Sequence, residues 1–115
     1  MTIEKFEDLL VWQKSKEFVV RISLVFKDCK DYSFKDQIWR ASISIMNNIA
    51  EGFERRGDKE FKNFLNISKG SSGEVRSMLS LAYDLKYIDL IQKISLSDSC
   101  VELSRMLMGL MRSIK

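Results

Sequence analysis

Polar side chains recur along residues 40–51 at the three- and four-residue steps that place them on one face of a helix. The stripe consists of Arg40, Ser44, Asn47 and Glu51, and Asn48 lies beside it. Side chains at these steps can touch, so a hydrogen-bond network of arginine, asparagine and glutamate is sterically reasonable. Asparagine is a poor helix former, and two adjacent asparagines in a helix indicate a local requirement. We expect a structural polar network here, with a solvated helix face as the alternative.

Glu51 is also the best candidate for carboxylate chemistry, paired with Glu54 or Glu74. A di-iron bundle would use Glu-x-x-His motifs, and the chain contains no histidine. Serine nucleophiles lack a candidate base nearby, and the segment "GSSGE" lacks the Gly-Lys-Ser/Thr of a phosphate-binding loop. We therefore expect no enzymatic activity, no cofactor and no metal. A small-molecule or catalytic site at Glu51 and Glu74 is the competing hypothesis.

A basic cluster surrounds the segment "RRGD". Its members are Arg55, Arg56, Lys59, Lys62 and Lys69. Three carboxylates are interleaved with these cations, so local neutralisation is the first interpretation. The second is contact with the phosphates of a nucleic acid, for which the candidates are Arg55, Arg56, Lys59 and Lys62. The net charge of +3, from 19 basic and 16 acidic residues, permits such a partner without requiring one.

The elements that must position these residues are helices. A chain of 115 residues without proline, whose apolar residues recur at three- and four-residue steps, is typical of an all-α protein. We predict one domain, residues 1–115, with helices at about 8–27, 34–55, 59–86 and 96–114. The short links between them predict an antiparallel up-down-up-down four-helix bundle.

Several small polar residues are predicted to end these helices. The candidate N-caps are Asp8, Ser33, Asp58 and either Ser95 or Ser97. Gly57 is suited to the C-terminus of the second helix. The segment "KGSSGE" resembles a linker in composition, but the apolar face continues in phase across it, so we expect the third helix to continue through it.

The second helix carries two apolar stripes. The expected core stripe consists of Ile38, Ala41, Ser42, Ile45, Ile49 and Gly52. The second stripe consists of Trp39, Ile43, Met46, Ala50 and Phe53. A surface helix needs only one such stripe, so the second stripe is covered either by wider burial within the same bundle or by another subunit. Trp39 favours the subunit interface, because tryptophan is enriched at protein contacts.

Location and cysteine chemistry are also predicted from composition. No window approaches the roughly 18 apolar residues needed to span a bilayer, and acidic residues precede any apolar run, so we expect a soluble cytoplasmic protein. Cys29 and Cys100 lack metal-ligand spacing, and we expect both to be buried, reduced thiols.

Three segments, "FEDLLVWQKSKEFV", "FKDQIWRASISIMNNIAEGFER" and "EFKNFLNISKGSSGEVRSMLSLAYDLKYI", cover most of the chain. They resemble the bacterial four-helix bundle proteins encoded in intervening sequences of 23S ribosomal RNA genes. The resemblance implies a left-handed up-down bundle that assembles as a ring-shaped homopentamer. Two positions depart from the family: Trp39 stands where a small or polar residue is usual, and Ser23 where an aromatic residue is usual.

The resemblance also implies roles for polar residues. Those matching the recurring polar positions of the family are Arg40, Asn48, Glu51, Ser71 and Glu74. They would form an internal polar network, with structure as the first role and ligand recognition as the second.

The gene location of the family suggests association with fragmented ribosomal RNA. Similar bundles serve as basic pentameric accessory proteins of retroelement reverse transcriptases, and the near-even charge here makes that alternative less attractive. Our leading hypothesis is a non-enzymatic, homo-oligomeric binding or assembly module for RNA or a ribonucleoprotein. A retroelement accessory protein and a protein–protein scaffold are the alternatives.

Overall fold

The computed structural model describes residues 3–114. After a short 3-10 helix, Phe6–Asp8, come four α-helices: α1 Leu10–Val25, α2 Tyr32–Glu54, α3 Asp58–Asp84 and α4 Leu90–Ser113. No strand occurs within this part of the chain, and the prediction of an all-α protein with four helices is confirmed.

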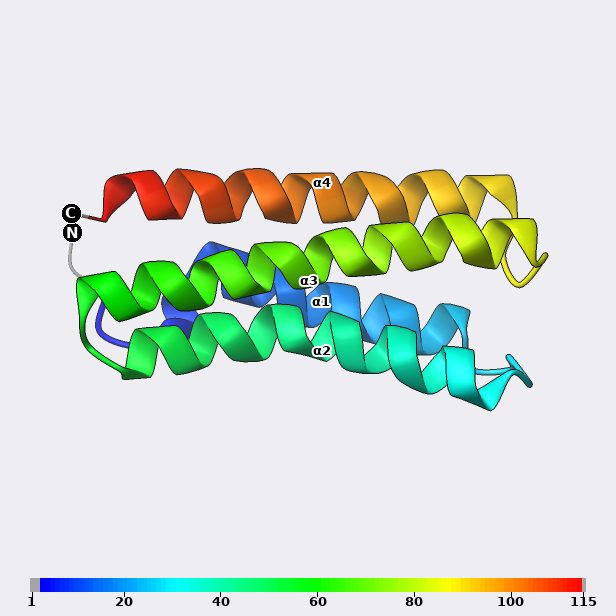
Figure 1. Ribbon diagram of the computed structural model, residues 1–115, viewed down its shortest axis with the longest axis horizontal. Helices are drawn as coiled ribbons and strands as arrows, with labels where there is room; N and C mark the ends of the chain where they lie inside the picture. The colour runs from blue at the N-terminus through cyan, green and yellow to red at the C-terminus, as the bar shows by residue number, and fades with distance from the viewer. Residues whose placement is uncertain (1–2, 115) are drawn as a thin grey trace.

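The four helices lie side by side in an elongated body of 44 × 21 × 20 Å (Figure 1). Both the α1–α2 and the α3–α4 connections lie at one end. The α2–α3 turn lies at the other end, near the 3-10 helix and the C-terminal end of α4 (Figure 1). The turn that carries the basic cluster is therefore at the opposite end from the two remaining connections.

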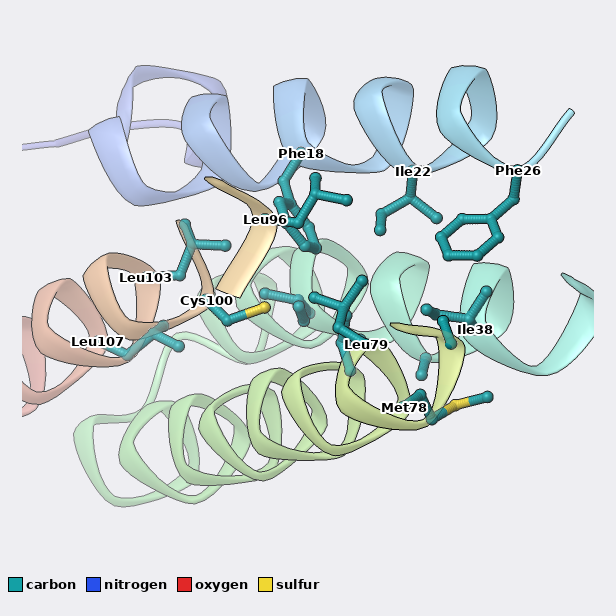
Figure 2. Close-up of a cluster of buried hydrophobic side chains, with 14 of the residues drawn as sticks. Phe18, Ile22, Phe26, Ile38, Met78, Leu79, Leu96, Cys100, Leu103 and Leu107 are labelled. Atoms are coloured by element: carbon teal, nitrogen blue, oxygen red, sulfur yellow. The ribbon is translucent and has the colours of Figure 1, made fainter. Parts of the chain in front are cut away.

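The hydrophobic core takes side chains from all four α-helices (Figure 2). Phe18 and Ile22 of α1 meet Ile38 of α2, Leu79 of α3 and Leu96 of α4, and each of the five is at most 2% exposed. Burying a side chain of this size contributes about 1.5–3 kcal/mol. The predicted core stripe of α2 is buried in full. This common core fixes the rotation of each helix and so decides which residues face outward.

Buried serines allow α3 to pack closely against two neighbours. Ser68 Oγ donates to the carbonyl of Ile45 in α2 at 2.7 Å, and Ser72 Oγ donates to the carbonyl of Cys100 in α4 at 2.9 Å. Each hydroxyl is satisfied by a main-chain oxygen, so its burial does not leave an unpaired donor. The prediction that α3 continues through "KGSSGE" is confirmed.

Two predicted N-caps are wrong because nearby aspartates cap the helices instead. Asp31, not Ser33, caps α2, and its side chain accepts a hydrogen bond from the Phe34 amide. Asp89 caps α4 through a capping box with Gln92, so that helix begins at Leu90 and not near residue 96. The segment predicted as the third connection is therefore partly helical.

The first and third helices begin without a side-chain cap. Asp8, the predicted cap of the first helix, lies in the 3-10 helix, and the N-cap position of α1 is Leu9. Asp58 is the first residue of α3, and Gly57 takes the N-cap position before it. The order of helices is as predicted, and their ends differ from the prediction by one or two residues, except that α4 begins six residues earlier.

Candidate functional site

The α2–α3 turn is built around an arginine in a left-handed backbone conformation. Arg55 is the C-cap of α2, and Arg56 follows with φ of 62°. Gly57, predicted to end the helix, has φ of −120° and lies in extended backbone. The left-handed residue after a helix is usually glycine, because glycine has no Cβ to collide there. Here Arg56 takes this position and projects a long cation from the turn.

Arg55 is neutralised by carboxylates on both helices. Its guanidinium lies 3.5 Å from Glu51 and 3.9 Å from Glu60, and it packs 5.2 Å above the ring of Phe64. These ion pairs are half exposed, so their contribution to stability is small. For Arg55, the structure shows the local neutralisation that the interleaved charges predict.

Arg56 has a different environment. Its guanidinium carbon lies 5.0 Å from the centroid of the Phe53 ring, and Nη2 donates to the Glu4 carbonyl at 3.3 Å. Within residues 3–114 neither Arg56 nor the exposed Lys59 forms an ion pair. Lys62 lies half-buried on α3, one turn beyond Lys59. The turn therefore presents positive charge through Arg56 and Lys59 more than through Arg55.

The polar stripe of α2 forms a smaller network than predicted. Asn48 Nδ2 donates to both the carbonyl and the hydroxyl of Ser44, and Ser44 Oγ lies 2.8 Å from Ser71 Oγ. Asn48 and Ser71 are thus brought together through Ser44, a stripe member that joins α2 to α3. The sequence indicated this contact, because Ser44 lies four residues before Asn48 and side chains at that spacing are neighbours on a helix.

The remaining members of the predicted network lie apart from this centre. Arg40 pairs with Asp36 at 2.8 Å, Glu51 pairs with Arg55, and Asn47 is exposed. The place of Arg40 and Glu51 on the outer side of α2 explains why they pair along their own helix. These positions correct the expectation of one connected internal network.

The two carboxylates of the competing hypothesis are not brought together. Glu74 lines a shallow cavity of about 480 Å³ with Arg40 and Ser44. Glu51 lies seven residues beyond Ser44, about 10.5 Å further along α2. Among residues 3–114 there is also no group of three or more His, Cys, Asp or Glu side chains suited to a metal ion.

The second apolar stripe of α2 is covered in part by the bundle itself. Ile43, Met46, Ala50 and Phe53 are half-buried, while Trp39 is 43% exposed. Trp39 borders a cavity of about 310 Å³ between α1 and α2, together with Tyr32 and Ser23. The two positions that depart from the family pattern therefore line the same cavity.

The two thiols differ in their surroundings. Cys100 is buried, and this burial raises its pKa to about 12. Cys29 is only half-buried, so the prediction of two buried thiols is wrong for this residue. It lies in the α1–α2 connection, where it packs against the edge of the core. Both cysteines are free thiols.

Across residues 3–114, every helix is too short or too polar to cross a bilayer.

The model of the 23S rRNA-intervening sequence protein family matches residues 7–109. A crystal structure from Bacteroides thetaiotaomicron, of a protein with unknown function from the S23 ribosomal protein family, is 30% identical with a TM-score of 0.82. That similarity covers 89% of this chain and 98% of the other. A search of curated protein sequences finds no match. The match over residues 7–109 shows that the chain belongs to the 23S rRNA-intervening sequence protein family.

Proposed function

We propose that this protein is a non-enzymatic binding and assembly module of the cytoplasm that self-associates and contacts RNA, alone or within a ribonucleoprotein. The left-handed, antiparallel up-down-up-down arrangement and the homopentamer implied by the resemblance are part of the same proposal. RNA is favoured over a small metabolite as the proposed ligand, because Glu51 pairs with Arg55 while Glu74 lines a separate cavity, so the two carboxylates do not form one metabolite site.

The observation that carries the RNA contact is the charge of the α2–α3 turn. Arg56 projects from a left-handed backbone position without a carboxylate partner in the described part of the chain. Lys59 lies close by in the first turn of α3. A guanidinium in this state is available for charge-assisted hydrogen bonds to phosphate oxygens. Each phosphate contact of this kind adds salt-dependent affinity.

The test replaces Arg56 with the residue its backbone favours. Arg56→Gly removes the cation and relieves the left-handed conformation at φ of 62°, so the fold is retained. We expect affinity for a labelled single-stranded RNA to fall several-fold, and the salt dependence to lose about 0.7 in log–log slope. Fluorescence anisotropy at several salt concentrations measures both quantities.

The matched control lies at the other end of the bundle. Lys86 has φ of 65° at the C-terminus of α3, so Lys86→Gly makes the same backbone change and the same charge loss. It should leave RNA affinity unchanged beyond the small effect of net charge. Arg55→Glu combined with Arg56→Glu should abolish binding. If this double variant binds like the parent, the turn is not the RNA contact.

Self-association is supported by the exposed Trp39 and by the family resemblance. Sedimentation velocity and light scattering should give a mass several times that of the 13.4 kDa chain. A monomer at micromolar concentration contradicts the assembly part of the proposal.

A further inference from the structure

A groove lies between the outer sides of α3 and α4, with a volume of about 500 Å³. Lys69 and Arg76 supply its cations, Gly70 and Gly73 lie between them on α3, and Ser104 lines it from α4. Lys69 and Arg76 are seven residues apart, which places their Cα atoms about 10.5 Å apart along the helix axis. We call this feature the α3–α4 groove.

The charge of the α3–α4 groove is unbalanced. Its lining contains two cations and no carboxylate, and neither Lys69 nor Arg76 forms an ion pair within residues 3–114. In the other polar cavities, the cations share the lining with acidic residues: Arg40 with Asp36, and Arg21 with Glu17. A concave surface of one sign concentrates counter-ions, so the α3–α4 groove is suited to an anion.

The two glycines leave the main chain of α3 open within this groove. A Cβ built on Gly70 or Gly73 would meet no atom within 4 Å, whereas one on Gly52 would meet Phe64 Cβ at 2.5 Å. Glycine destabilises a helix interior relative to alanine. Packing within the chain explains this choice at Gly52 but not at Gly70 or Gly73. Their effect is to let an external group approach the backbone beside two cations.

The same face of α3 continues from the groove to the α2–α3 turn. Residues along it follow at steps of three and four: Lys59, Lys62, Asn66, Lys69, Gly73 and Arg76. The face contains no carboxylate from Lys59 to Arg76, a length of about 25 Å. Single-stranded nucleic acids are bound by positively charged grooves that follow their backbone.

We propose that the α3–α4 groove binds the backbone phosphates of a single RNA strand, which runs along α3 from the basic turn. Lys69 and Arg76 bind phosphate oxygens, and Gly70 and Gly73 allow the strand to approach α3. A single strand fits because neighbouring helix axes are only about 8–10 Å apart. This inference rests on the proposed function, since RNA is the ligand of both sites.

The five glycines of the chain allow both contacts to be followed at once. A ¹⁵N-glycine sample gives an amide signal for Gly57 at the turn and signals for Gly70 and Gly73 in the groove. Gly109, on α4 outside the groove, and the buried Gly52 are internal references. On titration with an oligouridylate of about 20 nucleotides, Gly57, Gly70 and Gly73 should shift while the references stay. Inorganic phosphate at equal phosphate concentration should shift the groove signals much less.

Two sets of variants test the groove chemistry directly. Lys69→Gln with Arg76→Gln should lower RNA affinity about tenfold and reduce the log–log salt slope by about 1.4. The matched control, Lys16→Gln with Lys27→Gln, removes the same charge from exposed residues of α1 and the segment after it, and should change affinity less than twofold. Gly73→Ala should raise the melting temperature and still weaken binding. A purely structural glycine would not show these opposite effects.

The outcomes separate the two proposals. The proposal for the groove is overturned if the Gly57 signal shifts while those of Gly70 and Gly73 do not, and the Lys69/Arg76 variant binds like the parent. The proposed RNA contact at the basic turn is then retained. If only the groove signals shift, the groove is supported and the turn contact is contradicted. Absence of RNA binding overturns both. If the groove signals respond equally to inorganic phosphate, the groove binds a free anion and the RNA proposal is overturned. If they respond to protein concentration alone, the groove binds a second copy of the chain and the RNA proposal is again overturned.

Discussion

At the scale of single residues, the carboxylate of Asp31 joins two distant parts of the chain. Oδ1 accepts the Phe34 amide at 3.2 Å and so caps α2, while Oδ2 accepts the Tyr87 hydroxyl at 2.6 Å. Tyr87 belongs to the α3–α4 connection, and its ring packs against Phe34 at 5.3 Å. One exposed side chain thus holds the start of α2 and the α3–α4 connection together at one end of the bundle.

This arrangement makes stability depend on pH. The Tyr87 hydroxyl, and then the Phe34 amide, lower the pKa of Asp31 below 3.8. The stabilisation is therefore fully present above pH 3.8 and is lost as the pH falls through the lowered pKa. The same hydrogen bond raises the pKa of Tyr87 above 10.0, so the contribution of Tyr87 is lost as the pH rises through that higher value.

Tyr87→Phe tests this linkage, because it removes the hydroxyl and keeps the ring. We expect a lower melting temperature than the parent at neutral pH, and a difference that shrinks as the pH falls below 3.8. Tyr32→Phe is the matched control, since Tyr32 is 72% exposed, and it should leave the melting temperature unchanged. Thermal melts from acid to neutral pH measure all three proteins. A pH-independent difference for Tyr87→Phe would show that the bond to Asp31 is not the cause.

At the scale of elements, helix identity followed from periodicity, while helix ends depended on competing caps. Ser33 and Asp31 both suit an N-cap, and only the contact with the Phe34 amide selects Asp31. Asp89 and Gln92 are spaced as a capping box, but the apolar residues after Asp89 resembled a connection. Leu90, Ile91 and Ile94 are in fact exposed residues of α4. Their exposure depends on the neighbouring helices, which the local pattern does not specify.

Gly52 determines how closely the ends of α2 and α3 approach each other. A Cβ at this position would meet Phe64 Cβ at 2.5 Å and the Phe61 ring at 3.2 Å. In Gly52→Ala, the steric clash should lower the free energy of unfolding by about 1–3 kcal/mol. The higher helix propensity of alanine offsets up to about 1 kcal/mol of this loss. Gly109→Ala meets no atom within 4 Å and should raise it by about 0.5–1 kcal/mol. Urea denaturation measures both, and effects of the same sign would contradict this account of the α2–α3 contact.

At the scale of the whole molecule, the exposed large apolar residues are unevenly distributed. The exposed large apolar residues near the α1–α2 and α3–α4 connections are Leu24, Tyr32, Trp39, Leu81, Leu85, Leu90, Ile91 and Ile94. The opposite end carries Arg55, Arg56 and Lys59 of the α2–α3 turn. The basic turn was recognisable from sequence because its residues are contiguous. The α3–α4 groove was not, because it depends on the rotation of α3 beside α4.

The uneven surface predicts that self-association and RNA contact depend on different residues. Trp39 is 43% exposed and borders the α1–α2 cavity beside Tyr32. Trp39→Glu should weaken self-association by about 2 kcal/mol or more, roughly 30-fold in Kd, because a buried tryptophan contact would be replaced by a charge. Ile67→Glu is the control, since Ile67 is 52% exposed on α3 and lies outside this cavity. It should keep the parent mass in light scattering, with circular dichroism confirming that both variants fold.

The outcome decides which side of α2 mediates assembly. Loss of the oligomer in Trp39→Glu but not in Ile67→Glu supports an interface over the α1–α2 cavity, which the exposed Trp39 of the second stripe lines. An unchanged mass for Trp39→Glu contradicts that interface, and the remaining apolar residues at this end become the next to test. RNA binding per subunit should survive in a folded, dissociated Trp39→Glu variant, because Arg56 lies at the opposite end of the bundle (Figure 1). Affinity should nevertheless fall, because separate subunits lose the combined binding of several contacts on one strand.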